Sequence, residues 1–173
     1  MKIGYFTERF PYRCSLNESD LIKTDGICTD GGGIGNVVYN LLLQMAKKGH
    51  EVYVFTTAPM GEDTSVEEHE NVTVVRYKPQ FKVASSPVAL NHVYSRLTSN
   101  LDLDIIHAHF GNPLAPLGGA LYSKMHKKPF VITYHEDMIG GYGGLLRRTA
   151  IWFLNTFAVD RILSQADSVI TPS

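Results

Sequence analysis

Short apolar segments with strand character alternate with helical patterns along this 173-residue chain. Strand signals lie at residues 2–7, 51–56, 71–77, 104–110, 129–135 and 168–171. Helical patterns lie at 34–49, 114–126 and 145–165, and Ser86 as N-cap with Pro87 predicts a further helix over 86–99. Residues 58–70 are expected to form an acidic loop. This alternation predicts an α/β fold, a doubly wound parallel sheet with helices on both faces.

A glycine-rich stretch at residues 30–35 (Asp-Gly-Gly-Gly-Ile-Gly) runs directly into the strongest helical pattern. That pattern is a single apolar stripe, made of Ile34, Val37, Val38, Leu41, Leu42 and Met45. Lys47 and Lys48 complement the dipole in the last turn, and Gly49 can close the helix in the left-handed conformation. The exposed N–H groups of such a helix start can hold a phosphate or carboxylate. A tight turn without a ligand is the equal alternative.

Composition indicates one ordinary globular domain, because 44% of the residues are hydrophobic and 19% are charged. The net charge of −1, without a run of like charges, gives no indication of nucleic-acid binding. No signal-peptide pattern follows Met1, so we expect a cytoplasmic protein in which Cys14 and Cys28 are free thiols. The most apolar long segment, residues 149–159, is too short to span a bilayer.

Polar residues of chemical interest follow three of the predicted strands. The glycine stretch follows the first strand after an unusually long connection, residues 8–30. His109 and Asn112 come at the end of the fourth strand, and His135, Glu136 and Asp137 at the end of the fifth. His107 is expected inside its strand. Because ligands of doubly wound sheets bind at the carboxyl ends of the strands, these residues predict a site at one edge.

Several kinds of site can be compared with this pattern. Dinucleotide binding fits poorly, because the G-x-G-x-x-G spacing fails and no acidic residue ends the second strand. No P-loop motif is present. A metal-dependent hydrolase that uses His109, His135 and Asp137 remains an alternative, and so does a non-catalytic carbohydrate- or phosphate-binding module.

Taken together, the motifs resemble the N-terminal domain of a GT-B, family-4-type retaining glycosyltransferase. The resemblance rests on the glycine stretch with its helix and on the segments at 45–52, 104–110, 133–135 and 166–173, in the family's order. It implies a Rossmann-like domain over residues 1–173 that supplies the acceptor side of a cleft. The donor would be a nucleotide sugar, used as a substrate, with no cofactor and no metal.

The resemblance also implies roles for individual residues. Gly32 and Gly33 match the glycines that approach the donor diphosphate, and His135 matches the histidine near the transferred sugar. The acceptor side would include Gly35, His109, Asn112 and Glu136. Similar enzymes continue into a C-terminal domain that binds the sugar nucleotide, so we expect residues 1–173 alone to be inactive.

The helix predicted over residues 145–165 is rich in apolar and basic side chains, among them Trp152, Leu154 and Phe157. Because similar enzymes often use lipid-linked acceptors, a peripheral membrane contact is one interpretation of this surface. Packing against the sheet is the favoured one. We also expect part of the surface near Trp152 to be a contact with the missing second domain.

Overall fold

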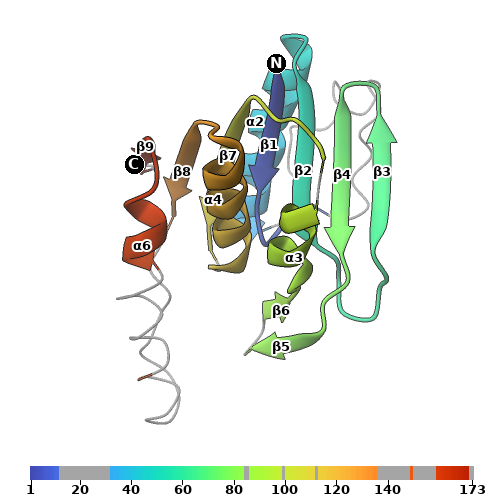
Figure 1. The fold of residues 1–173 in the computed structure, drawn as a ribbon. Coiled ribbons are helices and arrows are strands. Elements are labelled where there is room, and N and C mark those ends of the chain that lie inside the picture. The colour runs from blue at the N-terminus through green and yellow to red at the C-terminus, as the bar shows by residue number, and fades with distance from the viewer. Residues whose placement is uncertain are drawn as a thin grey trace.

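The computed structural model describes residues 1–11, 32–83, 86–98, 100–111, 113–135, 149 and 159–171. They form a seven-stranded sheet in the order β3-β4-β2-β1-β7-β8-β9 (Figure 1). All neighbours pair in parallel except β3 and β4. The strands are β1 (Lys2–Phe6), β2 (Glu51–Thr57), β3 (Ser65–His69), β4 (Val72–Tyr77), β7 (Ile105–Phe110), β8 (Phe130–Tyr134) and β9 (Ser168–Ile170). The predicted doubly wound α/β fold is confirmed.

Helices cover both faces of this sheet, as Figure 1 shows. Helix α2 (Gly32–Lys47) lies on one face, where its apolar stripe packs on β1, β2 and β4. The other face carries α3 (Asn91–Thr98), α4 (Leu114–His126) and α6 (Asp160–Leu163), and its core includes Phe6, Phe55 and Phe110. Apolar burial on both faces stabilises a parallel sheet and explains its continuous apolar strands.

The glycine stretch leads into α2 as the sequence predicts, but the helix begins earlier than its apolar stripe. Gly32 and Gly33 already belong to the first turn. At the other end, Lys47 lies in the last turn and Gly49 has a φ of +80°. A left-handed residue at this place ends the helix, and glycine adopts that conformation without steric cost.

Helix α4 matches the predicted range at both ends. It approaches the sheet closely at Gly119, where a Cβ atom would lie 3.2 Å from side-chain atoms of both Phe6 and Ile106. A larger residue at this position would push the helix away from the core.

Residues 58–70 do not form only a loop, and this prediction was wrong. Ser65–His69 form strand β3, which pairs antiparallel with β4 through a tight hairpin. The sequence Ser-Val-Glu-Glu-His carries little apolar signal because β3 is an edge strand that is mostly exposed. Edge strands of this kind are stabilised by their partner strand, and local hydrophobic periodicity does not reveal them.

The helix predicted over residues 86–99 was also partly wrong. Ser86 and Pro87 belong to β6 (Ser86–Val88), which pairs with β5 (Phe81–Val83) in a short separate hairpin. The helix begins only at Asn91. Proline is compatible with both a helix start and an edge strand, so the Ser-Pro pair alone could not decide between them.

A helix was predicted over residues 145–165, and the structure gives bounds for one part of it, α6. Residues 145–148 and 150–158 lie outside the described residues, and they include Trp152, Leu154 and Phe157. The expectations about membrane or domain contact at Trp152 therefore stay predictions. Cys14 and Cys28 also lie outside the described residues. Within the described part of the chain, none of the helices has the length and apolar character needed to cross a bilayer.

Candidate active site

The carboxyl ends of the parallel strands point to one edge of the sheet, the lower one in Figure 1, and segments far apart in the sequence meet there. A Cβ atom on Gly111, which follows β7, would lie 2.9 Å from Cδ1 of Ile34 and 3.9 Å from Oε2 of Glu8. The end of β1, the first turn of α2 and the end of β7 are thus in contact. This is the edge at which doubly wound sheets bind ligands.

The first turn of α2 presents glycine backbone at this edge. Gly33 is exposed, and a Cβ atom placed on it would have no heavy atom within 4 Å. Gly35 is buried, and its Cβ would lie 3.4 Å from Cδ of Pro11 and 3.5 Å from the carbonyl oxygen of Arg9. Gly33 therefore faces open space, whereas Gly35 packs against the segment that follows β1.

Three histidines form a row on the α2 face of the sheet: two lie within β7, and the third follows β8. The rings of His107 and His109 stack with centroids 4.5 Å apart, and those of His109 and His135 with centroids 5.3 Å apart. Nδ1 of His109 lies 3.0 Å from Nε2 of His135, and Nε2 of His107 lies 2.8 Å from Oγ1 of Thr133. The ring of Tyr5 lies tilted beside those of His107 and His109, with centroids 5.2 Å and 6.0 Å away. We refer to His107, His109 and His135 as the histidine row.

Strand geometry accounts for this arrangement. Residues two apart on a strand face the same side, so His107 and His109 both project from the α2 face of β7. The parallel register pairs His109 with Thr133, which places His135 one step further on the same face. His107 lies inside its strand, as predicted, but His109 also lies within β7 and is fully buried.

Burial keeps the two β7 histidines neutral. It lowers the pKa of His107 to about 4, and the nearby His135 lowers it further. Burial also lowers the pKa of His109 to about 2, with added lowering from His107 and His135. Both side chains are thus neutral at pH 7, and each carries one N–H donor and one bare acceptor nitrogen.

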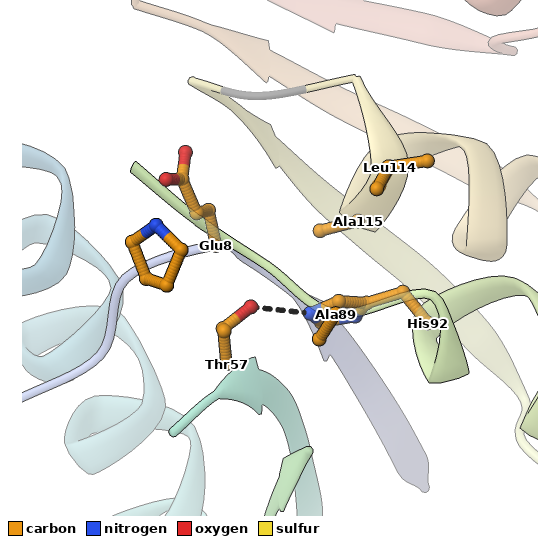
Figure 2. A pocket seen from close by; sticks show the side chains of 7 residues that line it. Glu8, Thr57, Ala89, His92, Leu114 and Ala115 are labelled. Atoms are coloured by element: carbon orange, nitrogen blue, oxygen red, sulfur yellow. Dashed lines mark hydrogen bonds between the residues drawn. The ribbon is translucent and has the colours of Figure 1, made fainter. Parts of the chain in front are cut away.

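A small pocket lies at the same edge on the opposite face, between the ends of β1 and β2 and the starts of α3 and α4. Figure 2 shows Glu8, Thr57 and His92 around it, with Nε2 of His92 3.0 Å from Oγ1 of Thr57. Leu114 and Ala115 form its apolar side. The pocket is too narrow to admit a water molecule, so in this conformation it is a packed junction and not a binding cavity.

Arg76 holds the segment that leaves β1. Its side chain is only 2% exposed, and its guanidinium group donates hydrogen bonds to the carbonyl oxygens of Phe10 (3.4 Å) and Pro11 (2.7 Å). Nε of Arg76 lies 2.6 Å from Oε1 of Glu67 on β3. Because Pro11 in turn lies close to Gly35, this ion pair supports the start of α2.

Gly33, Gly35, His109 and His135 belong to segments at the carboxyl edge of the sheet, and Gly32 lies in the first turn of α2. Their roles in a site stay predictions. Asn112, Glu136 and Asp137 lie outside the described residues. Among the residues whose positions are described, no cluster of His, Cys, Asp and Glu side chains could hold a metal ion.

Sequence reasoning missed Glu8, His92 and Arg76. Glu8 stands at the beginning of a long polar connection with no motif around it, and His92 follows a hairpin that we predicted as a helix. A charged residue inside an apolar strand was the available signal for Arg76, because such residues are rarely buried without a partner.

Comparisons with known proteins agree with this architecture. Residues 31–173 match the model of Glycosyltransferase Family 4. The O-antigen chain mannosyltransferase C of Escherichia coli is 28% identical over 142 residues, which cover 82% of this chain and 36% of that protein. The chain thus spans little more than a third of that relative's length.

Solved structures show the same fold. A chain of sucrose-phosphate synthase from Thermosynechococcus elongatus superposes with a TM-score of 0.56 at 16% identity, covering 100% of this chain and 77% of the other. A second chain of the same enzyme gives a TM-score of 0.50 at 13% identity, with coverages of 99% and 47%. The family model covers most of the chain, so this protein belongs to glycosyltransferase family 4, and its fold is that of the N-terminal domain of a GT-B glycosyltransferase.

Proposed function

We propose that this chain is the acceptor-side domain of a retaining glycosyltransferase that moves a sugar from a nucleotide-sugar donor to an acceptor hydroxyl. The observation that carries the proposal is the family match over residues 31–173. The meeting of the α2 start with the ends of β1 and β7 at the carboxyl edge supports it. The proposed residue roles rest on the resemblance to this family, and the position of the segments at the carboxyl edge supports them.

In this proposal the first turn of α2 holds the donor diphosphate. The first N–H groups of a helix have no intrahelical partner, so those at Gly32 and Gly33 can donate to phosphate oxygens. The open space at Gly33 lets a phosphate approach the backbone closely. Donors fixed in this way stabilise the negative charge that grows on the leaving diphosphate during transfer.

His135 is proposed to position the transferred sugar by hydrogen bonding at the end of β8. Gly35, Asn112 and Glu136 complete the proposed acceptor side. His109 is fully buried at this edge, so its contribution to the acceptor site would pass through His135, its neighbour.

Retention places bond breaking and bond formation on the same face of the sugar. The bond between the anomeric carbon and the leaving phosphate oxygen breaks, and the acceptor oxygen bonds to that carbon from the same side. The proton of the acceptor hydroxyl passes to the leaving phosphate oxygen, so no residue of this chain needs to take it up.

The name of the Escherichia coli relative makes a mannosyl donor the first candidate and a lipid-linked or free glycan the acceptor. A C-terminal domain would bind the nucleotide base and ribose. We therefore expect residues 1–173 alone to show no transfer, and a peripheral membrane contact would follow if the acceptor is lipid-linked.

The test is a donor screen on the full-length protein, with transfer from nucleotide-mannose measured first and the anomeric configuration of the product determined. His135→Ala should lower the transfer rate by about 10² or more, the effect expected of a positioned polar group. Acceptor binding without transfer would instead indicate a carbohydrate-binding module. Activity that a chelator abolishes and zinc restores through His109 and His135 would indicate the metal-dependent hydrolase.

A further inference from the structure

A hydrogen bond joins the rings of His109 and His135 at the carboxyl edge of the sheet. His109 is fully buried, and its Nδ1 lies 3.0 Å from Nε2 of His135. Its other ring nitrogen, Nε2, is buried as well and has no hydrogen-bond partner among the residues that the structure describes. Nδ1 of His109 therefore takes part in a hydrogen bond, and its Nε2 has none among the described residues.

A neutral imidazole carries its single proton on one of the two nitrogens, which leaves two arrangements. With the proton on Nε2, His109 would bury an N–H donor that has nothing to donate to. With the proton on Nδ1, it donates to His135 and leaves only a bare acceptor at Nε2. Orphaned buried N–H groups are rare in native proteins because each loses a hydrogen bond to water without replacement, whereas under-satisfied acceptors are less rare.

We propose that His109 is a positioning residue, which donates from Nδ1 to Nε2 of His135 and thereby fixes His135 in the tautomer that carries its proton on Nδ1. Because Nε2 of His135 accepts this bond, any hydrogen bond that His135 makes through its second nitrogen is made by Nδ1 as a donor. A proton on Nε2 would place two N–H groups face to face.

The consequence for catalysis rests on the proposed function. If His135 positions the sugar or acceptor, it does so by donating a hydrogen bond from Nδ1 to a substrate oxygen. It does not take up the acceptor proton at Nε2. This agrees with a transfer step in which the leaving phosphate receives that proton.

The tautomer can be observed directly by ¹⁵N NMR of the histidine rings in the full-length protein at pH 7.5. We expect His135 to show a protonated Nδ1 and a bare Nε2, opposite to the form that free neutral histidine prefers. In His109→Leu, His135 should shift toward protonation at Nε2. The matched control is His107→Leu, which removes a neighbouring half-buried ring of the same row without removing the bond between His109 and His135, and it should leave the tautomer unchanged.

Kinetics supply a second readout. His109→Leu should lower kcat by about tenfold or more with little change in donor KM, an effect comparable to losing other residues that orient a site side chain. His109→Asn can place an amide N–H near the position of Nδ1 and should restore part of the rate. A structural role alone predicts no such rescue.

A wild-type His135 protonated at Nε2 would overturn the inference, and that spectrum decides the matter even if His109→Leu fails to fold. An unchanged His135 tautomer in a folded His109→Leu would also overturn it. Absence of transfer in the full-length protein would overturn the proposed function instead, and the spectrum would still test the tautomer.

Discussion

At the scale of single residues, Gly33 should affect donor binding without affecting folding. A Cβ at Gly33 meets no atom within 4 Å, so Gly33→Val adds its side chain to open space at the start of α2. The same side chain would obstruct a phosphate bound at the helix N-terminus. We expect the full-length variant to keep its melting temperature and to raise the donor KM or abolish transfer.

Gly119→Val is the matched control for this substitution. It adds the same side chain where a Cβ would lie 3.2 Å from Phe6 and Ile106, and overpacking of this kind costs about 1–3 kcal/mol. The control should therefore lower the melting temperature. Wild-type kinetics in Gly33→Val would contradict the proposed diphosphate site.

The histidine row also predicts how stability depends on pH. The folded-state pKa is lowered to about 4 for His107 and to about 2 for His109, from an ordinary value of 6.5. Below pH 6.5 the unfolded chain therefore binds more protons than the folded one, and stability falls as the pH falls. Each histidine should contribute a loss of roughly 2 kcal/mol between pH 6.5 and pH 5.

Urea unfolding at pH 7 and at pH 5 measures this loss. His107→Gln should make the free energy of unfolding less dependent on pH across this interval. His50→Gln, which lies outside the histidine row, controls for the loss of a histidine as such. Equal pH dependence in wild type and His107→Gln would show that His107 is not held neutral by the fold.

At the scale of elements, an ion pair joins β3 to β4 in addition to their antiparallel backbone pairing. Glu67 on the edge strand is the carboxylate beside the buried guanidinium of Arg76. Glu67→Ala removes the carboxylate and leaves the buried charge of Arg76 without its ion-pair partner on β3. Breaking a buried ion pair in this way lowers the free energy of unfolding by about 3–5 kcal/mol. We take the lower end, about 3 kcal/mol, because Glu67 is 35% exposed.

Glu68→Ala supplies the comparison, because Glu68 is its exposed neighbour on the same strand and should change stability by no more than about 0.5 kcal/mol. The double variant Glu67→Ala with Arg76→Met should recover part of the loss. Chemical denaturation measures all three, and equal stabilities of the two Glu→Ala variants would contradict the role of the pair.

The elements that the sequence predicts well are those with a complete local signal. Helix α4 has matching bounds because Pro113 directly precedes it and Lys127 ends it in the left-handed conformation, and α2 ends where Gly49 takes a positive φ. Strand β3 was predicted as a loop and the hairpin at Ser86 and Pro87 as a helix. Both predictions were wrong because these segments are held by their partner strands. Pairing between strands is a tertiary contact that local propensity does not encode.

For the candidate site, the sequence could predict which segments lie at the same edge of the sheet, but not the contacts between their side chains. Strand ends placed His135 and the glycines at one edge, because parallel strands of a doubly wound sheet share a direction. The bond between His109 and His135 depends on the register of β7 against β8, and the ion pair of Arg76 depends on Glu67 of β3, a strand that we had not predicted. Neither follows from spacing along the chain.

At the scale of the whole molecule, the two edges of the sheet differ. Strand β3 exposes Glu68 and carries Glu67, and charges on an edge strand discourage pairing with another sheet. Strand β9 has no charged residue, and Val169 and Ile170 are 48% and 45% exposed. We expect the chain of residues 1–173 to self-associate through β9 at high concentration.

Sedimentation velocity over a range of concentrations measures this association. Val169→Lys places a charge on β9 and should weaken it. Val66→Lys makes the same change at the exposed position of β3 and should have no effect. Equal association of the wild type and Val169→Lys would exclude the β9 edge as the contact.

The difference between the edges also limits how far such association can proceed. A sheet with two open edges can add copies at both ends and grow into a filament. Of the two edges of the seven-stranded sheet, only β9 carries no charged residue in the described part of the chain, so two copies that pair β9 against β9 use up both uncharged edges. The symmetry of that contact is a closed twofold, and growth stops at the dimer.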